Sequence, residues 1–128
     1  MAGFSDYTEN KVLDLLRGTA WTPPAGLYIG LYSAAPTDAG GGTEVTTTIR
    51  VAGRVAATFP AASGGTMSNS ALVDFGTAAG AATVTHFGIF DAASGGNLLA
   101  WNAVTTPLAI GAGVQVSFPI GTLTVTLD

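Results

Sequence analysis

Apolar and polar residues alternate in short runs along most of the chain, and this pattern is typical of β-strands with one buried face. In residues 27–33, Leu27, Ile29 and Leu31 alternate with two tyrosines and a glycine. Residues 122–127 alternate hydrophobic residues with threonine in the same way. Turns rich in glycine and proline separate the runs. We therefore predict a mainly β fold, either an antiparallel β-sandwich or a small barrel.

The clearest element is a hairpin formed by residues 84–90 and 98–101. Residues 91–97, between the two runs, are Asp, Ala, Ser, Gly and Asn, and most of these types favour turns. Both faces of the first strand are largely apolar, because Phe87 and Ile89 lie on one face and Phe90 lies on the other. This strand is therefore predicted to be central in its sheet and covered on both sides.

Further extended segments are predicted from the same signals, although they are weaker. Pro107 indicates an edge position for its segment, because proline cannot donate to a strand ladder. These segments are residues 44–49, 55–59, 67–75, 104–110 and 114–118.

Residues 5–17 are the only stretch with a clear helical period. Ser5 or Asp6 can cap this predicted helix, Asp6 and Glu9 have the spacing of a capping box, and Gly18 is a natural stop. The helix either closes one side of the β body or docks onto a neighbouring subunit. Its apolar face supplies four candidate partner-binding residues, namely Tyr7, Val12, Leu15 and Leu16.

The length of 128 residues is that of one domain with a hydrophobic core of useful size. We expect a single domain over residues 1–128, with the helix at 5–17 and the β body at 26–128. No internal repeat of fixed period is present, which argues against a solenoid or a propeller.

Charge is sparse, at 9% of residues against roughly 25% in an ordinary soluble domain. The chain has only four basic residues, so it cannot form the basic cluster that direct nucleic-acid binding requires. Mean hydropathy is +0.47, yet every apolar stretch is too short to span a membrane as a helix, and we expect no membrane partner. A surface with few charges favours association, which suggests a homo-oligomer.

The sequence lacks the residue types and motifs that common catalytic sites require. Cysteine is absent, His86 is the only histidine, and no Gly-x-Ser-x-Gly nucleophile motif occurs. His86 is expected to be a core or interface residue. A calcium site at Asp91 and Asn97 is conceivable but would be weak, because it offers one carboxylate. We predict no enzyme activity, no cofactor and no metal site.

Three further residues are candidates for partner binding, because they lie in or beside predicted loops: Trp21, Tyr32 and Asp38. The aromatic residues could form a platform for stacking sugars, or they could pack in the core or at a subunit interface. The sequence leaves both interpretations open.

The order of several segments resembles a family of small bacteriophage virion proteins that are generally labelled tail fibre or tail proteins. The segment after Thr43 departs from the usual family pattern, because residues 46–54 are longer and rich in threonine. The resemblance rests on residues 26–33, 35–38, 41–45, 67–70, 86–99 and 123–127.

This resemblance implies a non-enzymatic structural protein of the phage particle, assembled in the host cytoplasm and placed on the virion surface. A compact β domain with few charges suits a capsid decoration (cement) protein, and we expect that role first, as a trimer bound to the major capsid protein or to other virion proteins. The alternative is a tail fibre or tail-tip component that binds a host receptor or glycan.

Overall fold

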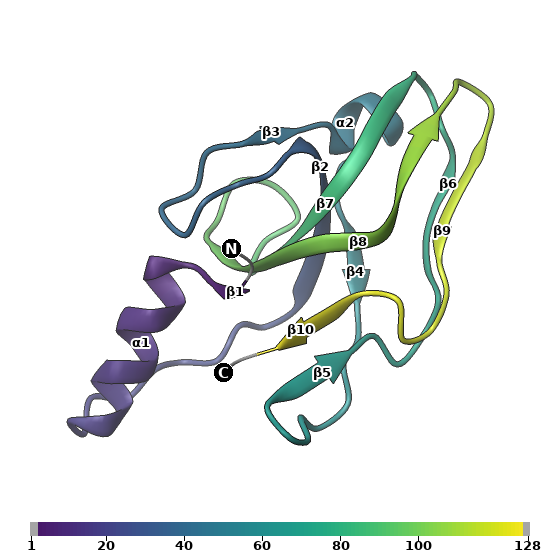
Figure 1. Cartoon of the computed structure of the whole chain (residues 1–128). Helices are drawn as coiled ribbons and strands as arrows, with labels where there is room; N and C mark the ends of the chain where they lie inside the picture. The colour runs from purple at the N-terminus through teal and green to yellow at the C-terminus, as the bar shows by residue number, and fades with distance from the viewer. Residues whose placement is uncertain (1–2, 127–128) are drawn as a thin grey trace.

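The computed structural model describes residues 3–126, and antiparallel strands are its main regular structure (Figure 1). The final predicted strand extends to Leu127, which lies outside the described residues. The elements in chain order are β1 (Gly3–Phe4), α1 (Asp6–Leu16), β2 (Leu27–Ala34), β3 (Thr43–Glu44), α2 (Thr46–Ile49), β4 (Val55–Ala57), β5 (Thr66–Ser68), β6 (Val73–Thr77), β7 (Ala82–Phe90), β8 (Leu98–Ile110), β9 (Gln115–Phe118) and β10 (Thr124–Thr126).

The largest sheet has the strand order β1-β8-β7-β2-β3, and β4 also pairs with β2. Two smaller sheets are formed by β6 with β9 and by β5 with β10. Every strand pair is antiparallel, which confirms the predicted mainly β class. Within residues 3–126 the strands do not close on themselves, so the barrel alternative is wrong.

The hydrophobic core lies on one face of the large sheet. Ile29 and Leu31 of β2 and Phe87 of β7 are fully buried there, as the alternation in the sequence predicts. The small sheets complete the same cluster, with Phe75 against Phe118 in an edge-to-face contact at 5.9 Å. Antiparallel layers thus share one core.

The predicted hairpin is confirmed, because β7 and β8 pair directly and residues 91–97 connect them. β7 lies between β2 and β8, so it is central, as predicted. Its outer face holds Phe90, whose ring stacks on Tyr32 of β2 at 6.5 Å and 8°. Gly88 makes room for these rings, because a Cβ there would lie 3.1 Å from a carbon atom of each.

The predicted strand at residues 44–49 is wrong, because Thr46–Ile49 forms the short helix α2. The reason is tertiary: Thr46 is 1% exposed, and its Oγ1 accepts a hydrogen bond from the backbone N–H of Leu31 at 2.9 Å. A buried side-chain contact thereby overrides the β propensity of threonine.

The predicted segments at 67–75 and 104–110 have different bounds in the structure. Asn69 interrupts the first, because its buried amide donates to the carbonyl groups of Ala71 and Pro119 and accepts from the backbone N–H of Leu123. The second is the continuation of β8, which shifts register near Pro107. β1 pairs only with Ala100 and Trp101 of β8, so Pro107 lies on the edge side of the sheet, as predicted.

Candidate functional site

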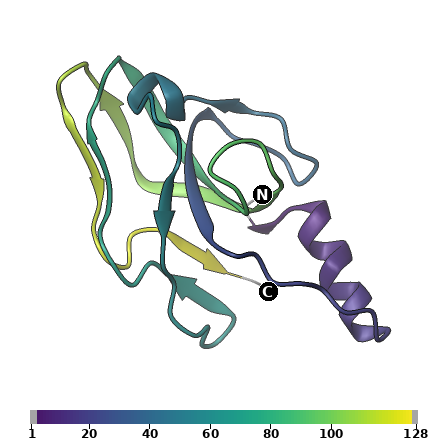
Figure 2. The same ribbon diagram turned by 180° about the vertical axis from the view of Figure 1, so that it is seen from behind.

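Helix α1 is attached to the sheet at its start and projects from it at its end (Figures 1 and 2). Ser5 is the cap: its Oγ accepts from the backbone N–H of Thr8 at 3.3 Å and donates to the carbonyl group of Leu98 in β8. The predicted Asp6–Glu9 capping box is wrong, because Asp6 is already the first helical residue. The predicted stop is confirmed by the positive φ of Gly18 and its bond to the carbonyl group of Leu15.

The far half of α1 exposes its leucines. Leu13 is 60% exposed, Leu15 is 49% exposed and Leu16 is 81% exposed, while Val12 is half-buried. Thr8 is the one residue of the helix that is fully buried. The structure therefore does not support the interpretation that this helix closes the β body.

A pocket of about 440 Å³ lies where the start of α1 meets the outer face of the large sheet. We call it the aromatic pocket. It brings together three of the predicted partner-binding residues, Tyr7, Tyr32 and Asp38, which come from different parts of the chain. Trp21 packs edge-on against Tyr7 at 6.5 Å but does not line the pocket. The lining residues are Ser5, Asp6, Tyr7, Tyr32, Asp38, Ala39, Gly40, Gly41, Phe90, Gly96, Asn97 and Leu98.

The polar groups of the aromatic pocket are held in place by hydrogen bonds. Asp38 Oδ1 accepts from Trp101 Nε1 at 3.1 Å, and the Asp38 carbonyl group accepts from the Asp6 N–H at 2.8 Å. Asn97 donates its backbone N–H and its side-chain amide to the two carboxylate oxygens of Asp91, at 2.7 and 2.9 Å. The second oxygen of Asp38 and the amide oxygen of Asn97 make no hydrogen bond within residues 3–126 and remain available to a ligand.

Tyr32 forms the buried base of the aromatic pocket, with 4% of its surface exposed. Burial, aided by the negative charge of Glu44 and opposed by Arg54, raises the pKa of Tyr32 to about 12. Its hydroxyl group is therefore protonated at neutral pH. Among the described residues it makes no hydrogen bond, so it can donate one to a bound molecule.

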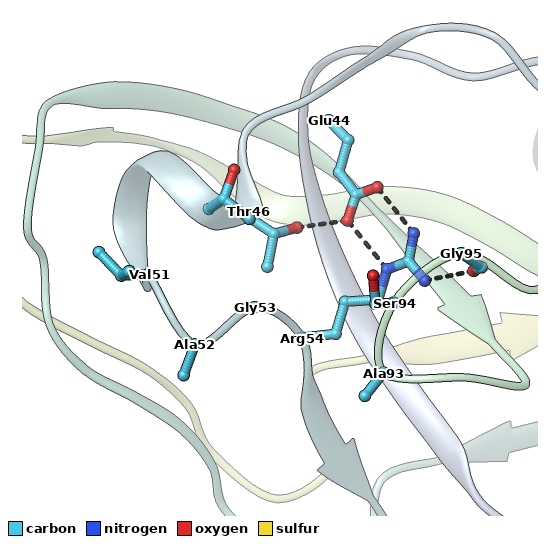
Figure 3. Close-up of a pocket in the computed structure, with 10 residues that line it drawn as sticks. Glu44, Thr46, Val51, Ala52, Gly53, Arg54, Ala93, Ser94 and Gly95 are labelled. Atoms are coloured by element: carbon cyan, nitrogen blue, oxygen red, sulfur yellow. Dashed lines mark hydrogen bonds and ion pairs between the residues drawn. The ribbon is translucent and has the colours of Figure 1, made fainter.

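A second pocket, of about 370 Å³, lies on the other side of the loop at residues 91–97 (Figure 3). Its central group is Arg54, which lies over the Phe90 ring at 3.4 Å from the centroid. The guanidinium group donates to Glu44 from Nε at 3.0 Å and from one terminal nitrogen at 2.9 Å. Its other terminal nitrogen donates to the carbonyl groups of Ala92 at 3.0 Å and Gly95 at 2.7 Å. Arg54 thus ties the 91–97 loop to β3 and β4.

The charge state of Glu44 follows from these contacts. Desolvation alone would raise the pKa of Glu44, but hydrogen bonds from Arg54 and Thr46, together with the charge of Arg54, lower it. Glu44 is therefore ionised at neutral pH, and its salt bridge with Arg54 is partly screened from water by burial. Neither residue was singled out from the sequence. The available signal was that Arg50 and Arg54 are the only basic residues of the predicted β body.

The remaining sequence predictions concern catalytic and metal chemistry. His86 is half-buried, contacts Thr85 Oγ1 through Nδ1 at 2.8 Å and packs near Trp101, so it fits the core or interface role. Both carboxylate oxygens of Asp91 are occupied by Asn97, which leaves no support for the calcium alternative. Residues 3–126 contain no cluster of metal-ligating side chains. Within that range, every helix is also too short or too polar to cross a membrane.

Comparison with known proteins assigns the family. No curated protein matches this sequence. The sequence model of the family described as "Podophage GP4 fiber I protein gp80" matches residues 3–126. This match confirms the resemblance to phage tail fibre proteins and overturns the expectation of a capsid decoration protein, which had rested on size and charge alone. The chain belongs to the podophage GP4 fiber I protein gp80 family, and it is a non-enzymatic structural component of a phage fibre.

Proposed function

We propose that this fibre protein binds the host surface, through a receptor or glycan that enters the aromatic pocket. The observation that carries the proposal is the convergence of Tyr7, Tyr32 and Asp38 in one cavity. Binding pockets characteristically combine apolar walls with a few fixed polar groups, and their usual volume is about 300–1,000 Å³. The aromatic pocket has this composition and size.

The proposal is tested by filling the pocket from its rim. Ala39 is exposed and lines the aromatic pocket, so Ala39→Trp should block it without disturbing the core. Ala93→Trp is the matched control, because Ala93 is an exposed alanine that lines the second pocket. The labelled wild-type protein and the control should bind host cells and compete with phage adsorption, whereas Ala39→Trp should not. Equal binding by both variants would contradict the proposal.

A second proposed role is self-association through α1, which the exposed Leu13, Leu15 and Leu16 favour. Adjacent exposed leucines on a projecting helix are unusual for a monomer in water. We propose that a second copy of this chain covers them, since a fibre is a repeated assembly and homo-oligomers are the commonest kind. The trimer predicted from the sequence followed from the decoration role, so its copy number stays a prediction.

Sedimentation equilibrium of the wild type and of Leu13→Ser/Leu16→Ser tests this second role. We expect an oligomer for the wild type and a folded monomer for the variant, because both leucines are exposed in the single chain. A wild-type monomer at all concentrations would rule out the second copy. The helix would then be free to contact another virion protein.

A further inference from the structure

We infer that the aromatic pocket binds an uncharged or amino-bearing saccharide and discriminates against acidic saccharides. This inference rests on the proposed function, because it names the class of ligand for the same pocket. Three features of the described residues support it: the sign of the charges that line the pocket, the hydrogen-bonding state of its polar groups and the hydrogen bonds that hold one of its walls.

The charged side chains that line the pocket are two carboxylates, Asp6 and Asp38. Arg54 lies beyond the 91–97 loop and is already paired with Glu44. The Lys11 ammonium group lies 5.6 Å from the centre of the Tyr7 ring and is not part of the lining. An incoming carboxylate, sulfate or phosphate group would therefore meet like charge, whereas an ammonium group would be attracted.

The helix start does not reverse this preference. A helix N-terminus attracts anions when its N–H groups are free. Here three of the first four N–H groups, those of Asp6, Thr8 and Glu9, already donate to the Asp38 carbonyl group, to Ser5 Oγ and to the Ser5 carbonyl group, so within the described residues only the N–H of Tyr7 is left. The acidic residues of the first turn further offset the positive end of the helix. The two carboxylates therefore make the electrostatic potential in the aromatic pocket negative.

The polar groups suit hydroxyl-rich ligands. The free oxygens of Asp38 and Asn97 accept hydrogen bonds, and the Tyr32 hydroxyl group donates, so vicinal hydroxyls could be bound from both sides. Tyr7 lines the same pocket and is half-buried, which offers an aromatic surface to the C–H groups of a pyranose ring. The described residues contain no buried side-chain oxygen or nitrogen without a partner, so the unpartnered Tyr32 hydroxyl group is accessible to solvent and to a ligand.

The wall formed by the 91–97 loop is held by hydrogen bonds before a ligand arrives, which limits the entropy cost of binding. Arg54 fixes Ala92 and Gly95, and Asp91 fixes Asn97 at the end of the same loop. Gly96 is exposed, but a Cβ there would collide with Asp91 Oδ1. The loop therefore presents Asn97 in one arrangement.

The test is a printed array of bacterial surface saccharides in which each acidic glycan stands beside its carboxyl-reduced, neutral form. We expect the protein to bind neutral or amino-bearing glycans and to prefer the reduced form in each pair. One like-charge contact at about 4 Å in water weakens binding roughly five-fold, so the preference should be about five-fold or more. The preference should shrink as salt is raised, because both carboxylates are partly in contact with solvent.

Two variants test whether the preference for carboxyl-reduced glycans arises in the aromatic pocket. Asp38→Asn keeps an oxygen for Trp101 and removes the charge, so it should reduce the preference for the reduced form. Asp14→Asn is the control, because Asp14 is on the same helix but does not line the pocket. An equal effect of both variants would overturn the inference.

The array and cell binding together separate this inference from the proposed function. Preference for acidic glycans overturns the inference but leaves host binding intact. Binding to host cells without binding to any glycan also overturns it and points to a protein receptor. Failure to bind either cells or glycans removes the proposed function itself.

Discussion

Replacing Arg54 with alanine should lower the free energy of unfolding by about 3 kcal/mol. The Arg54 side chain is only 10% exposed, and it donates four hydrogen bonds, two to Glu44 and two to carbonyl groups of the 91–97 loop. It also covers the Phe90 ring. The variant removes all of these contacts at once and leaves a partly buried carboxylate without its cation.

The magnitude lies between two reference cases. Breaking a fully buried ion pair costs about 3–5 kcal/mol, while an exposed pair is worth about 0–1 kcal/mol. Glu44 is 29% exposed and keeps its hydrogen bond from Thr46 at 2.6 Å, so water and Thr46 recover part of the loss. The lost cover over Phe90 adds to the cost. These terms place the value near the lower end of the buried range.

Chemical denaturation measures this value directly. The transition midpoint of Arg54→Ala should fall with an unchanged slope, and hydrogen exchange should accelerate at the amides of residues 92–97. Arg17→Ala is the control, because the exposed pair of Arg17 with Asp14 should contribute less than about 0.5 kcal/mol. If the two variants are equally stable, Arg54 does not hold the loop and the reasoning fails.

Two more predictions concern the same region. Gly96→Ala should destabilise the protein by about 2 kcal/mol more than Gly95→Ala, because both have positive φ but only the Cβ at Gly96 would collide with Asp91; equal values from denaturation would contradict this. The lowered pKa of Glu44 contributes stability that is present above about pH 4.5 and is lost as the pH falls through the lower folded value. Glu44→Gln should therefore flatten the acid limb of a stability–pH curve relative to the wild type, and an unchanged acid limb would contradict this.

The elements that were predicted correctly are those whose signal is local. The β7–β8 hairpin follows from its own turn residues, and α1 follows from its apolar period and the stop at Gly18. The helix α2 could not be predicted, because Thr46 is helical through its buried contact with Leu31 of β2. Its own sequence favours a strand.

The sequence predicted three residues of the candidate site, but it did not predict that they lie next to one another. Tyr7, Tyr32 and Asp38 were each chosen for type and position, yet they meet only because β8 brings Trp101 to Asp38 and Leu98 to the helix cap. The salt bridge of Glu44 with Arg54 depends in the same way on β2 pairing with both β3 and β4. Such contacts between distant segments follow from the topology of the sheet, which the alternation of apolar and polar residues does not specify.

The pairing of β1 with β8 sets the order in which the molecule can fold. Gly3 lies opposite Trp101, so this pairing closes one of the longest loops in the chain, and such contacts form slowly. The sequentially close pair β7 and β8 can form first. We expect the start of α1, and with it one wall of the aromatic pocket, to be added late in folding. During synthesis, the exposed leucines of α1 emerge from the ribosome long before β8, which holds the start of this helix, so early misassociation of nascent fibre chains is expected at α1.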